Sequence, residues 1–472
     1  MGGFFGVATD NDCVNDLFFG TDYQSHLGTM RGGLAVRSKD GIDRIIHDIT
    51  NTQFRSKFDS DISSLSGTTG IGVISDYEDQ PIMVTSHLGR YAIVTVGVVQ
   101  NADEIVASAF KRKRAHFAEV SHGHVNPTEV VATLINEEDS FAAGLESAQN
   151  LIKGSCSILV LTHEGVYCAR DRLGRTPIII GRKEGGYAAT SETCAFPNLD
   201  YEIERDLGPG EIVLMTPEGL EQKKAPNGCM QMCSFLWVYY GYPSSTYENI
   251  NVEDARNRCG AALARRDRHE VDIAAGIPDS GTAHAIGYAI ERGIPYRRPF
   301  VKYTPTWPRS FMPQNQGVRN LVARMKLIPI KDLIKDQRIL FCEDSIVRGT
   351  QLQDIVQKVF EYGAREFHMR PACPPLVFGC KYLNFSRSRS ILDLATRKAI
   401  KEIEGTEDTE NPQEYADPAS DKYAQMVELI RQRLKLTSLQ FQELPDLVEA
   451  IGLPKEKLCT YCWDGCEGSC GT

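Results

Sequence analysis

The alternation of apolar and polar residues divides the chain into two halves. Up to about residue 230, short apolar runs such as 70–75, 91–99 and 156–161 are separated by Gly, Asp and Asn. This pattern predicts many short strands. Two stretches with helical periodicity, near 127–134 and 141–152, interrupt them. We therefore expect an α+β region rich in antiparallel sheet.

From about residue 250 the pattern changes to an alternation of strands and helices. The helical stretches are 252–266 and 282–292. The apolar runs between and after them predict strands at 271–276, 299–302, 338–342 and 366–371. Strands that alternate with amphipathic helices are typical of a parallel α/β domain.

The last part of the chain begins with a polar, acidic segment, residues 402–420. Its composition predicts a surface insertion or a flexible loop. Helices are expected near 421–434 and 445–451, and a cysteine-dense tail follows. We place domain boundaries accordingly at 1–230, 231–400 and 401–472.

Composition narrows the class of protein. The 472 residues suffice for two or three domains, and 42% hydrophobic with 24% charged residues is ordinary for a soluble globular chain. A net charge of −10 argues against a nucleic-acid-binding surface. No apolar run approaches the roughly 20 residues of a membrane span. The first residues, MGGFFGVATDND, do not form a secretory signal, so we expect a cytosolic protein.

One stretch, RILFCEDSIVRGTQ at 338–351, carries the strongest chemical signal. A short apolar strand ends in two carboxylates, a polar turn with a glycine follows, and a helix begins at about Gln351. Loop N–H groups and the positive end of a helix dipole converge on one anion in such an arrangement. The alternative is an ordinary strand–helix turn that contains Gly-Thr by chance.

This stretch resembles the phosphoribosyl-pyrophosphate (PRPP) motif of type I phosphoribosyltransferases, and DSIVRGT is similar to the version in the glutamine PRPP amidotransferase family. The resemblance implies that Glu343 and Asp344 hold the ribose hydroxyls or face a substrate-bound Mg²⁺. It also implies a loop for the 5′-phosphate, made of Ser345, Ile346, Val347, Arg348, Gly349 and Thr350.

Two further stretches match this family in order. GIPDSG at 276–281, with Asp279 and Ser280, corresponds to the loop that holds the pyrophosphate. Lys302 and the following YTPTWPRSF resemble the flexible loop that closes over PRPP, with Arg309 and Lys326 as cations for the diphosphate. The chain departs from the family at Glu343, where aspartate is usual, and at Gln351, where threonine is usual. We expect PRPP binding to tolerate these departures better than turnover does.

The N-terminal residues GGFFGV resemble the start of the family's N-terminal-nucleophile (Ntn) glutaminase domain, an αββα sandwich. The family's catalytic cysteine corresponds to Gly2, and glycine has no nucleophile. The arginine that grips glutamine corresponds to Ser75, the oxyanion segment His-Asn-Gly to Thr95-Val96-Gly97, and the substrate-binding aspartate to Pro127. We therefore predict that this domain does not hydrolyse glutamine. A misassigned start codon would leave Ser75, Val96 and Pro127 unexplained.

The chain has 14 cysteines, many for a cytosolic protein. In the iron–sulfur subclass of the family four cysteines hold a [4Fe–4S] cluster, and they match Cys233, Cys380, Cys459 and Cys462. Four thiolates also suit structural Zn²⁺, so zinc is the alternative. Cys466 and Cys470 are not assigned. The remaining cysteines that we predict to be small buried hydrophobes are Cys13, Cys156, Cys168, Cys194, Cys259 and Cys342.

Three hypotheses follow for function. The first is Mg²⁺-dependent phosphoribosyl transfer from PRPP to ammonia or a small amine, as in the first step of purine synthesis, with ammonia free or supplied by a partner glutaminase. The second is a silent paralogue that senses PRPP or nucleotides and regulates a partner. The third is an ordinary glutamine-dependent enzyme of the family. The resemblance also implies a homo-oligomer, commonly a tetramer, with no nucleic-acid or membrane partner.

Overall fold

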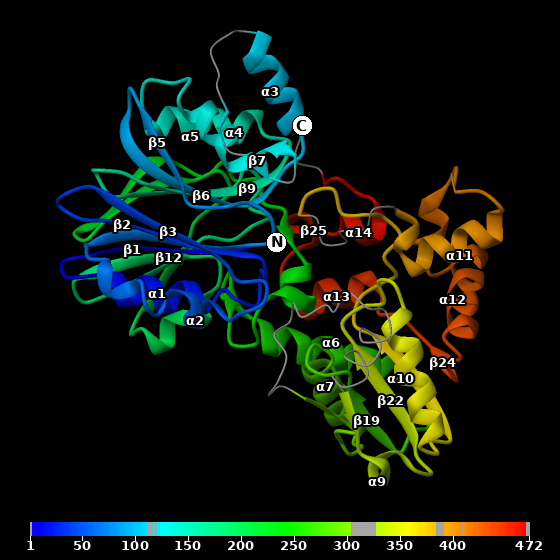
Figure 1. Ribbon diagram of the computed structural model, residues 1–472. Coiled ribbons are helices and arrows are strands. Elements are labelled where there is room, and N and C mark those ends of the chain that lie inside the picture. The colour runs from blue at the N-terminus through cyan, green and yellow to red at the C-terminus, as the bar shows by residue number, and fades with distance from the viewer. Residues whose placement is uncertain are drawn as a thin grey trace.

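The computed structural model describes residues 2–111, 117–118, 120–121, 123–303, 327–383, 391–407 and 409–468. Figure 1 shows two regions joined side by side, with the N-terminal region in blue to green and the C-terminal region in green to red. The α+β and α/β characters predicted for the two regions are both confirmed. None of the described helices has the length and apolar character needed to cross a membrane.

The N-terminal region consists of two antiparallel sheets between two layers of helices (Figure 1). The seven-stranded sheet has the order β13-β11-β12-β1-β4-β2-β3, formed by Glu202–Asp206, Ile179–Lys183, Gly186–Thr190, Gly3–Thr9, Thr69–Ser75, Arg31–Arg37 and Ile42–Asp48. The six-stranded sheet has the order β15-β14-β10-β9-β6-β5, formed by Gly219–Lys224, Ile212–Thr216, Val166–Ala169, Gly154–Leu161, Gly89–Val99 and Ile82–Ser86. The helices are α1 and α2 on one outer face and α3, α4 and α5 on the other, at Val14–Asp22, Phe54–Phe58, Ala102–Lys111, Pro127–Ile135 and Phe141–Leu151. This is the predicted αββα sandwich.

Strand β1 shows how the sequence specifies these layers. Every residue of β1 is buried, because the strand has a sheet neighbour on both edges and a packed layer on both faces. Phe4 and Ala8 point into the core between the two sheets, and Phe5 and Val7 point into the core beneath α1. This alternation is the period of two that a strand imposes. Helices α1, α2 and α3 are additional to the two helices that periodicity predicted.

The C-terminal region is built on a parallel four-stranded sheet with the order β19-β22-β23-β24, formed by Ile273–Gly276, Arg338–Glu343, Glu366–Pro371 and Ser438–Leu439. Leu340 and Cys342 face the core that holds helices α6 (Val252–Arg266) and α7 (Thr282–Arg292). Ile339 and Phe341 face the other core, with α10 (Thr350–Glu361) and α12 (Asp421–Arg433). Helices therefore cover both faces, as in doubly wound folds.

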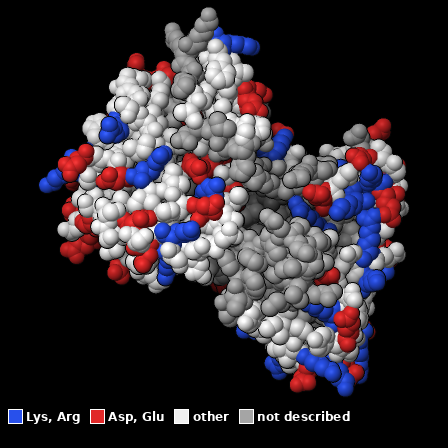
Figure 2. Space-filling model, in the orientation of Figure 1, with Lys and Arg blue, Asp and Glu red and all other residues white. Residues whose placement is uncertain are grey.

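The acidic segment 402–420, predicted as a surface insertion or a flexible loop, is largely exposed and contains regular structure among its described residues. Helix α11 (Ala395–Glu404) runs into it, a short 3₁₀ turn follows at Pro412–Tyr415, and Tyr415 is fully buried with its hydroxyl donating to Glu404. Lys422 of α12 forms ion pairs with Glu404 and Glu414. Figure 2 shows lysines and arginines gathered along the edge formed by α11 and α12. Basic side chains of neighbouring residues therefore compensate the acidic charge of this segment.

Two elements join the regions. Strand β16 (Met232–Cys233), which follows the N-terminal sandwich, pairs in parallel with β25 (Leu458–Cys459) near the C-terminus. One buried cluster also contains Leu17 of α1, Trp237 from the connecting segment and Trp463 of α14 (Tyr461–Asp464). The two regions thus share a core.

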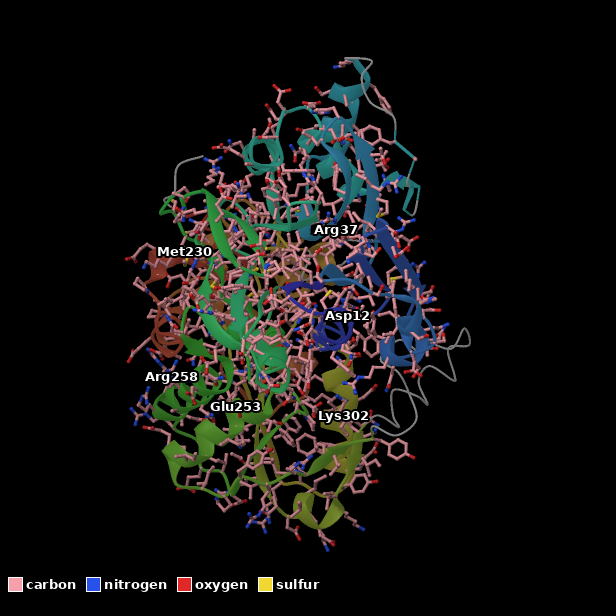
Figure 3. All side chains as sticks on the ribbon, turned by 90° about the vertical axis from the view of Figure 1, so that its left-hand side faces the viewer. Asp12, Arg37, Met230, Glu253, Arg258 and Lys302 are labelled. Carbon is pink, nitrogen blue, oxygen red and sulfur yellow. The ribbon has the colours of Figure 1, made fainter. Side chains whose placement is uncertain are left out.

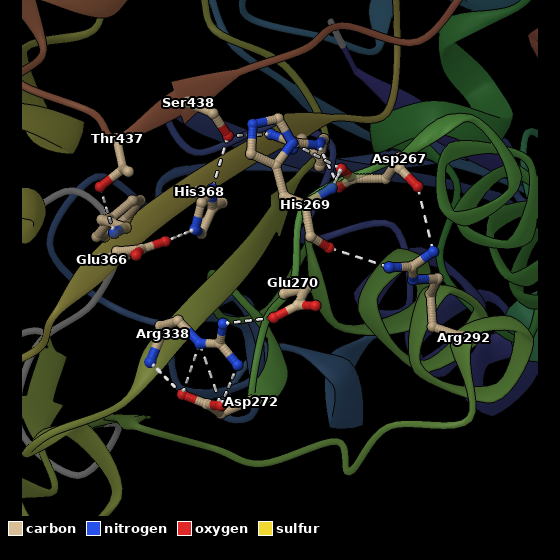
Figure 4. A network of polar contacts seen from close by, with 12 residues as sticks. Asp267, His269, Glu270, Asp272, Arg292, Arg338, Glu366, His368, Thr437 and Ser438 are labelled. Atoms are coloured by element: carbon tan, nitrogen blue, oxygen red, sulfur yellow. Dashed lines mark hydrogen bonds and ion pairs between the residues drawn. The ribbon is translucent and has the colours of Figure 1, made fainter.

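A polar network lies close to the amino ends of the parallel strands, beside the end of α6 (Figure 4). Arg370 and Asp267, both fully buried, form an ion pair at 2.7 Å, and Tyr288 also donates to Asp267. Burial alone would raise the pKa of Asp267, but hydrogen bonds and charge from Arg370 lower it below its ordinary value. At the first residue of β22, Arg338 pairs with Asp272. The charged side chains of this network are therefore paired with one another.

Candidate functional site

A cavity with a volume of about 780 Å³ lies at the carboxyl ends of the parallel strands. Glu343 is the last residue of β22, and the 344–349 loop leads directly into α10. Ligands of open α/β sheets bind at this edge. The predicted phosphate loop lines the cavity with all six of its residues: Ser345, Ile346, Val347, Arg348, Gly349 and Thr350.

The loop's shape depends on Gly349, which precedes α10 with φ of 75°. This left-handed conformation strains residues that have a Cβ. The turn directs the first residues of α10 toward the cavity, where the positive end of the helix dipole favours an anion. The side chain of Arg348 is exposed and lies 3.7 Å from Asp393.

The two predicted carboxylates both line the cavity. Ser280 donates to Glu343 at 3.0 Å, and Ser345 donates to Asp344. Burial and the neighbouring Asp344 charge raise the pKa of Glu343 well above its ordinary value. Among the described residues, no cation forms an ion pair with either carboxylate. The pair is therefore equipped to accept hydrogen bonds or to meet a cation brought by a ligand.

The predicted pyrophosphate loop follows β19, next to β22 in the sheet. Ser280 lines the cavity, and Asp279 points outward with 71% of its side chain exposed. Lys302, at the end of β20 (Phe300–Lys302), lies 2.6 Å from Asp279 and also lines the cavity. Figure 3 labels Lys302 in the lower, C-terminal half, on the side opposite Arg258.

Arg309 and Lys326 lie outside the described residues. The segment that contains them leaves β20 after Lys302 and returns in β21 (Leu327–Pro329), which pairs with β20 so that Lys302 is opposite Leu327. Both of these residues line the cavity. The chain therefore leaves and re-enters the described structure at the mouth of the candidate site.

The four predicted metal-binding cysteines come together at the junction of the two regions. The β16–β25 pairing sets Cys233 opposite Cys459. Burial, with Cys459 and Cys380 nearby, raises the pKa of Cys233, and a hydrogen bond with Cys380 together with burial raises the pKa of Cys462. Cys380 and Cys462 also line the 780 Å³ cavity. Four clustered and largely buried thiols, all among the described residues, are the residue type that holds a four-thiolate cluster, but no three of them lie where they could ligate a single metal ion in this structure.

No group of three or more His, Cys, Asp or Glu side chains in the described part of the chain has the spacing to hold a metal ion. The six cysteines predicted to be structural are all buried and free. Cys466 is exposed, and Cys470 lies outside the described residues.

The positions that correspond to the glutaminase nucleophile and glutamine clamp lie at adjacent strand ends. Strands β1 and β4 are antiparallel with Gly3 opposite Ile74, so Gly2 lies beside Ser75. A Cβ at Gly2 would lie only 2.3 Å from the Ile74 carbonyl oxygen. The Ser75 hydroxyl is engaged locally: it donates to Glu78 and accepts from the Tyr77 and Glu78 N–H groups. Gly2 therefore offers no nucleophile, and Ser75 offers no cation.

The oxyanion and aspartate positions are also occupied by structural contacts. Thr95, which precedes Val96 and Gly97, exchanges two hydrogen bonds with Gln80 and one with Thr128 at 2.6 Å. Val96 is buried in the core between the sheets. Pro127 is the first residue of α4, where Asn126 caps the helix. The hydrogen-bonding groups of Gln80, Thr95 and Thr128 are therefore paired with one another.

Sequence reasoning missed two buried arginines. Arg256 of α6 donates to the carbonyl groups of Trp237, Tyr239 and Gly241, and so fixes a π-helical turn whose Tyr239 and Tyr240 line the cavity. Arg175 lies beside the cysteine cluster. Both contacts join segments far apart in sequence, and neither has a local signal.

Comparisons with known proteins agree with this geometry. Residues 69–198 match the model of a glutamine amidotransferase domain. The amidophosphoribosyltransferase of Methanocaldococcus jannaschii is 29% identical over 98% of this chain and 97% of its own length. That of Archaeoglobus fulgidus is 31% identical over 80% of this chain and 83% of its own length. The structure of the glutamine PRPP amidotransferase of Bacillus subtilis complexed with ADP and GMP is similar with a TM-score of 0.83, at 25% identity over 98% of this chain and 96% of that one.

Proposed function

Because the chain belongs to the amidophosphoribosyltransferase family, we propose that its C-terminal half transfers the phosphoribosyl group of PRPP to ammonia or another small amine. The observation that carries this proposal is the cavity at the carboxyl edge of the parallel sheet. A carboxylate pair, an anion-binding loop and a helix N-terminus share its wall. This combination suits a sugar that carries phosphate groups.

In this proposal the residues divide the substrate between them. Glu343 and Asp344 orient the ribose hydroxyls, and residues 345–350 bind the 5′-phosphate. Asp279, Ser280 and Lys302, with Arg309 and Lys326 from the neighbouring segment, surround the diphosphate. Mg²⁺ held by the diphosphate neutralises part of its charge.

The reaction needs no group activated by the protein. The lone pair of the amine nitrogen forms a bond to C1 of the ribose while the bond from C1 to the diphosphate oxygen breaks. Pyrophosphate leaves with the electron pair, and the nitrogen releases a proton to solvent. Most of the catalysis is therefore stabilisation of charge on the departing pyrophosphate.

We propose further that the N-terminal half does not hydrolyse glutamine. Gly2 lacks a nucleophile, and the carbonyl oxygen of Ile74 already lies where a side chain would begin. Ser75, Val96 and Pro127 occupy the other family positions with side chains that cannot bind glutamine in the family's manner. Ammonia would then come from solution or from a separate glutaminase.

The remaining parts of the proposal concern cofactor and organisation. Cys233, Cys380, Cys459 and Cys462 would bind a [4Fe–4S] cluster, with Zn²⁺ as the alternative. The cluster would hold together segments from three parts of the chain. We take 1–230, 231–400 and 401–472 as the domains, and a cytoplasmic homo-oligomer, as large as a tetramer, as the assembly.

A second candidate is a non-catalytic sensor of PRPP or nucleotides. Two observations favour it: the filled glutaminase positions, and the raised pKa of Glu343, which opposes ionisation in the ligand-free chain. The third candidate, the glutamine-dependent reaction, remains the activity for which the family is named.

One assay separates the three. Anaerobically purified protein with Mg²⁺ and PRPP is given glutamine in one reaction and ammonium at alkaline pH in another, and pyrophosphate is measured. We expect release with ammonium alone. Release with glutamine, accompanied by glutamate, would instead support the glutamine-dependent enzyme, and PRPP binding without release in either reaction would support the sensor.

A further inference from the structure

Arg175 is a buried cation from the N-terminal region that reaches the cysteine cluster of the C-terminal region. It lies in the loop between β10 and β11, and only 3% of its surface is exposed. Its guanidinium carbon lies 3.7 Å from the centre of the Tyr382 ring, and its Nη2 donates to Gln231 at 2.9 Å. A charge so far from solvent needs a compensating group, because desolvation of an unpaired ion is costly.

The contacts of Arg175 surround the metal-binding cysteines. Gln231 is two residues before Cys233, and Tyr382 is two residues after Cys380. The backbone N–H of Cys233 donates to the carbonyl oxygen of Arg175 at 3.3 Å. Arg175 also lies close enough to Cys233 and Cys459 to interact with both electrostatically.

The Nε of Arg175 is buried and has no hydrogen-bond partner among the described residues. Buried N–H donors almost always have a partner, so this one indicates a group that completes the site. Among the described residues, Arg175 has no carboxylate within ion-pair distance either. Its charge and its spare donor are both available to the cysteine cluster.

We propose that Arg175 is the counter-charge of the four-cysteine metal site and donates a hydrogen bond to a ligand sulfur. This inference rests on the proposed function, which places a metal group on these cysteines. A Zn²⁺ ion and a cubane cluster in its resting state both leave four thiolates with two uncompensated negative charges. Arg175 offsets one of them from within the buried site, so the proposal holds for either metal.

In this proposal the N-terminal region supports the metal site, a role that does not involve glutamine. All four cysteines lie at or beyond residue 233, whereas the cation comes from the loop 171–177 of the Ntn-like sandwich. The sandwich would therefore cover the metal site and contribute the positive charge of Arg175 to it. Its packing against the site would be retained even where its own former catalytic positions are filled.

The test compares wild-type protein with Arg175→Met, Arg175→Lys and Arg172→Met, all purified anaerobically as full-length chains. Arg172 is exposed and lies in the same loop, so its variant controls for the change of an arginine at this place. Iron, sulfide and zinc are counted per chain, and the rate of metal loss is followed by visible absorbance in air and by transfer to a chelator. The melting temperature of the metal-free protein is measured in parallel.

We expect Arg175→Met to lose metal about 10- to 100-fold faster than wild type, the range typical of groups that support metal ligands. Arg175→Lys should recover most of the retention, because it keeps the charge while losing the planar stack on Tyr382. Arg172→Met should behave as wild type. The metal-free proteins should melt within a few degrees of one another.

Two results would overturn the proposal. If Arg175→Met holds metal as firmly as wild type, Arg175 is not the counter-charge, and the metal site itself stands. If Lys and Met variants lose metal equally and both metal-free proteins melt early, Arg175 is a packing contact between the regions. A wild-type chain that binds neither iron nor zinc removes the metal site, and the role of Arg175 with it.

Discussion

The predicted glutaminase positions and the cavity of the C-terminal region differ in how their polar groups are satisfied. In the N-terminal region, Gln80 and Thr128 hydrogen-bond to Thr95, beside the predicted oxyanion position Val96. In the C-terminal region, Glu343 and Asp344 face a cavity of about 780 Å³ without an ion-pair partner in the described structure. Polar groups that satisfy one another stabilise the fold, whereas groups left facing a cavity are available to a ligand.

The same contrast exists within the transferase sheet. On the face covered by α6 and α7, Arg370, Asp267 and Tyr288 form a closed network. At the carboxyl ends the loops open into the cavity. Stability and function are thus assigned to different parts of one domain. Four predictions sharpen or break this comparison.

The largest effect is expected at the closed network. Arg370→Met leaves Asp267 buried without its cation, which costs roughly 3–5 kcal/mol of the free energy of unfolding. Denaturant unfolding of the metal-free protein measures this loss. Exposed Arg365 lies at the surface near the same strand, and its Met variant is the control. An unchanged midpoint for Arg370→Met would show that the network is not a stabilising element.

The next largest effect is expected at the open pocket, and on chemistry instead of stability. Asp344→Asn keeps the shape of the side chain but removes the charge that would face the ribose or Mg²⁺ in the proposed function. Ammonium-dependent pyrophosphate release should fall roughly 10²–10³-fold, the range for loss of one group that stabilises a transition state. The control is Glu361→Gln at the exposed far end of α10.

The melting temperature of the ligand-free Asp344→Asn protein should not fall, because its charge has no ion-pair partner to lose in the described structure. PRPP affinity and turnover equal to wild type would remove Asp344 from the site. A variant that fails to fold would contradict the contrast between the closed network and the open cavity.

The third prediction concerns pH. Because burial and Asp344 raise the pKa of Glu343 in the folded, ligand-free chain, this chain holds a proton that the unfolded chain releases at lower pH. The stability contribution of Glu343 is therefore present at low pH and is lost as pH rises through the raised pKa. PRPP with Mg²⁺ favours the carboxylate, so affinity should rise with pH over the same window, up to about tenfold per pH unit.

Glu343→Gln tests both parts of this prediction. At neutral pH and above, the ligand-free variant should be at least as stable as wild type. Its PRPP affinity should be lower and should no longer change with pH across that window. Calorimetric titration of PRPP at several pH values measures this. A wild-type affinity that is flat across the same range would show that Glu343 is already ionised.

Local patterns in the sequence were sufficient for much of the fold. The helices at 252–266 and 282–292 were predicted with the bounds that the structure has, because caps and amphipathic periodicity are local. The short β24 has only two residues and gives no such signal. The acidic segment 402–420 was judged by charge alone, and its compensating lysines come from other elements.

The candidate site, too, could be predicted only where its residues are close together in the sequence. The loop 343–350 lies in one continuous stretch, so its residues could be assigned together. The pairing of Cys233 with Cys459, and the approach of Arg175 to both, depend on contacts across more than two hundred residues or between regions. The four cysteines were assigned through their similarity to the family and not from a local pattern. Nothing in the sequence around Arg175 distinguishes it from Arg172.

The smallest effect is expected from an attempt to restore the filled pocket. Gly2→Cys supplies the missing thiol, but its Cβ would lie 2.3 Å from the Ile74 carbonyl oxygen, so the strand must shift. Ser75 would still offer no cation for glutamine. We expect no measurable glutamate release from glutamine, alone or with Ser75→Arg, and unchanged turnover with ammonium. Mass spectrometry must first show that Met1 has been removed, because the nucleophile works only as the first residue. Glutamate release by Gly2→Cys that a glutamine-analogue affinity label abolishes would show that the pocket is open, and the contrast between the two regions would then reduce to a single missing side chain.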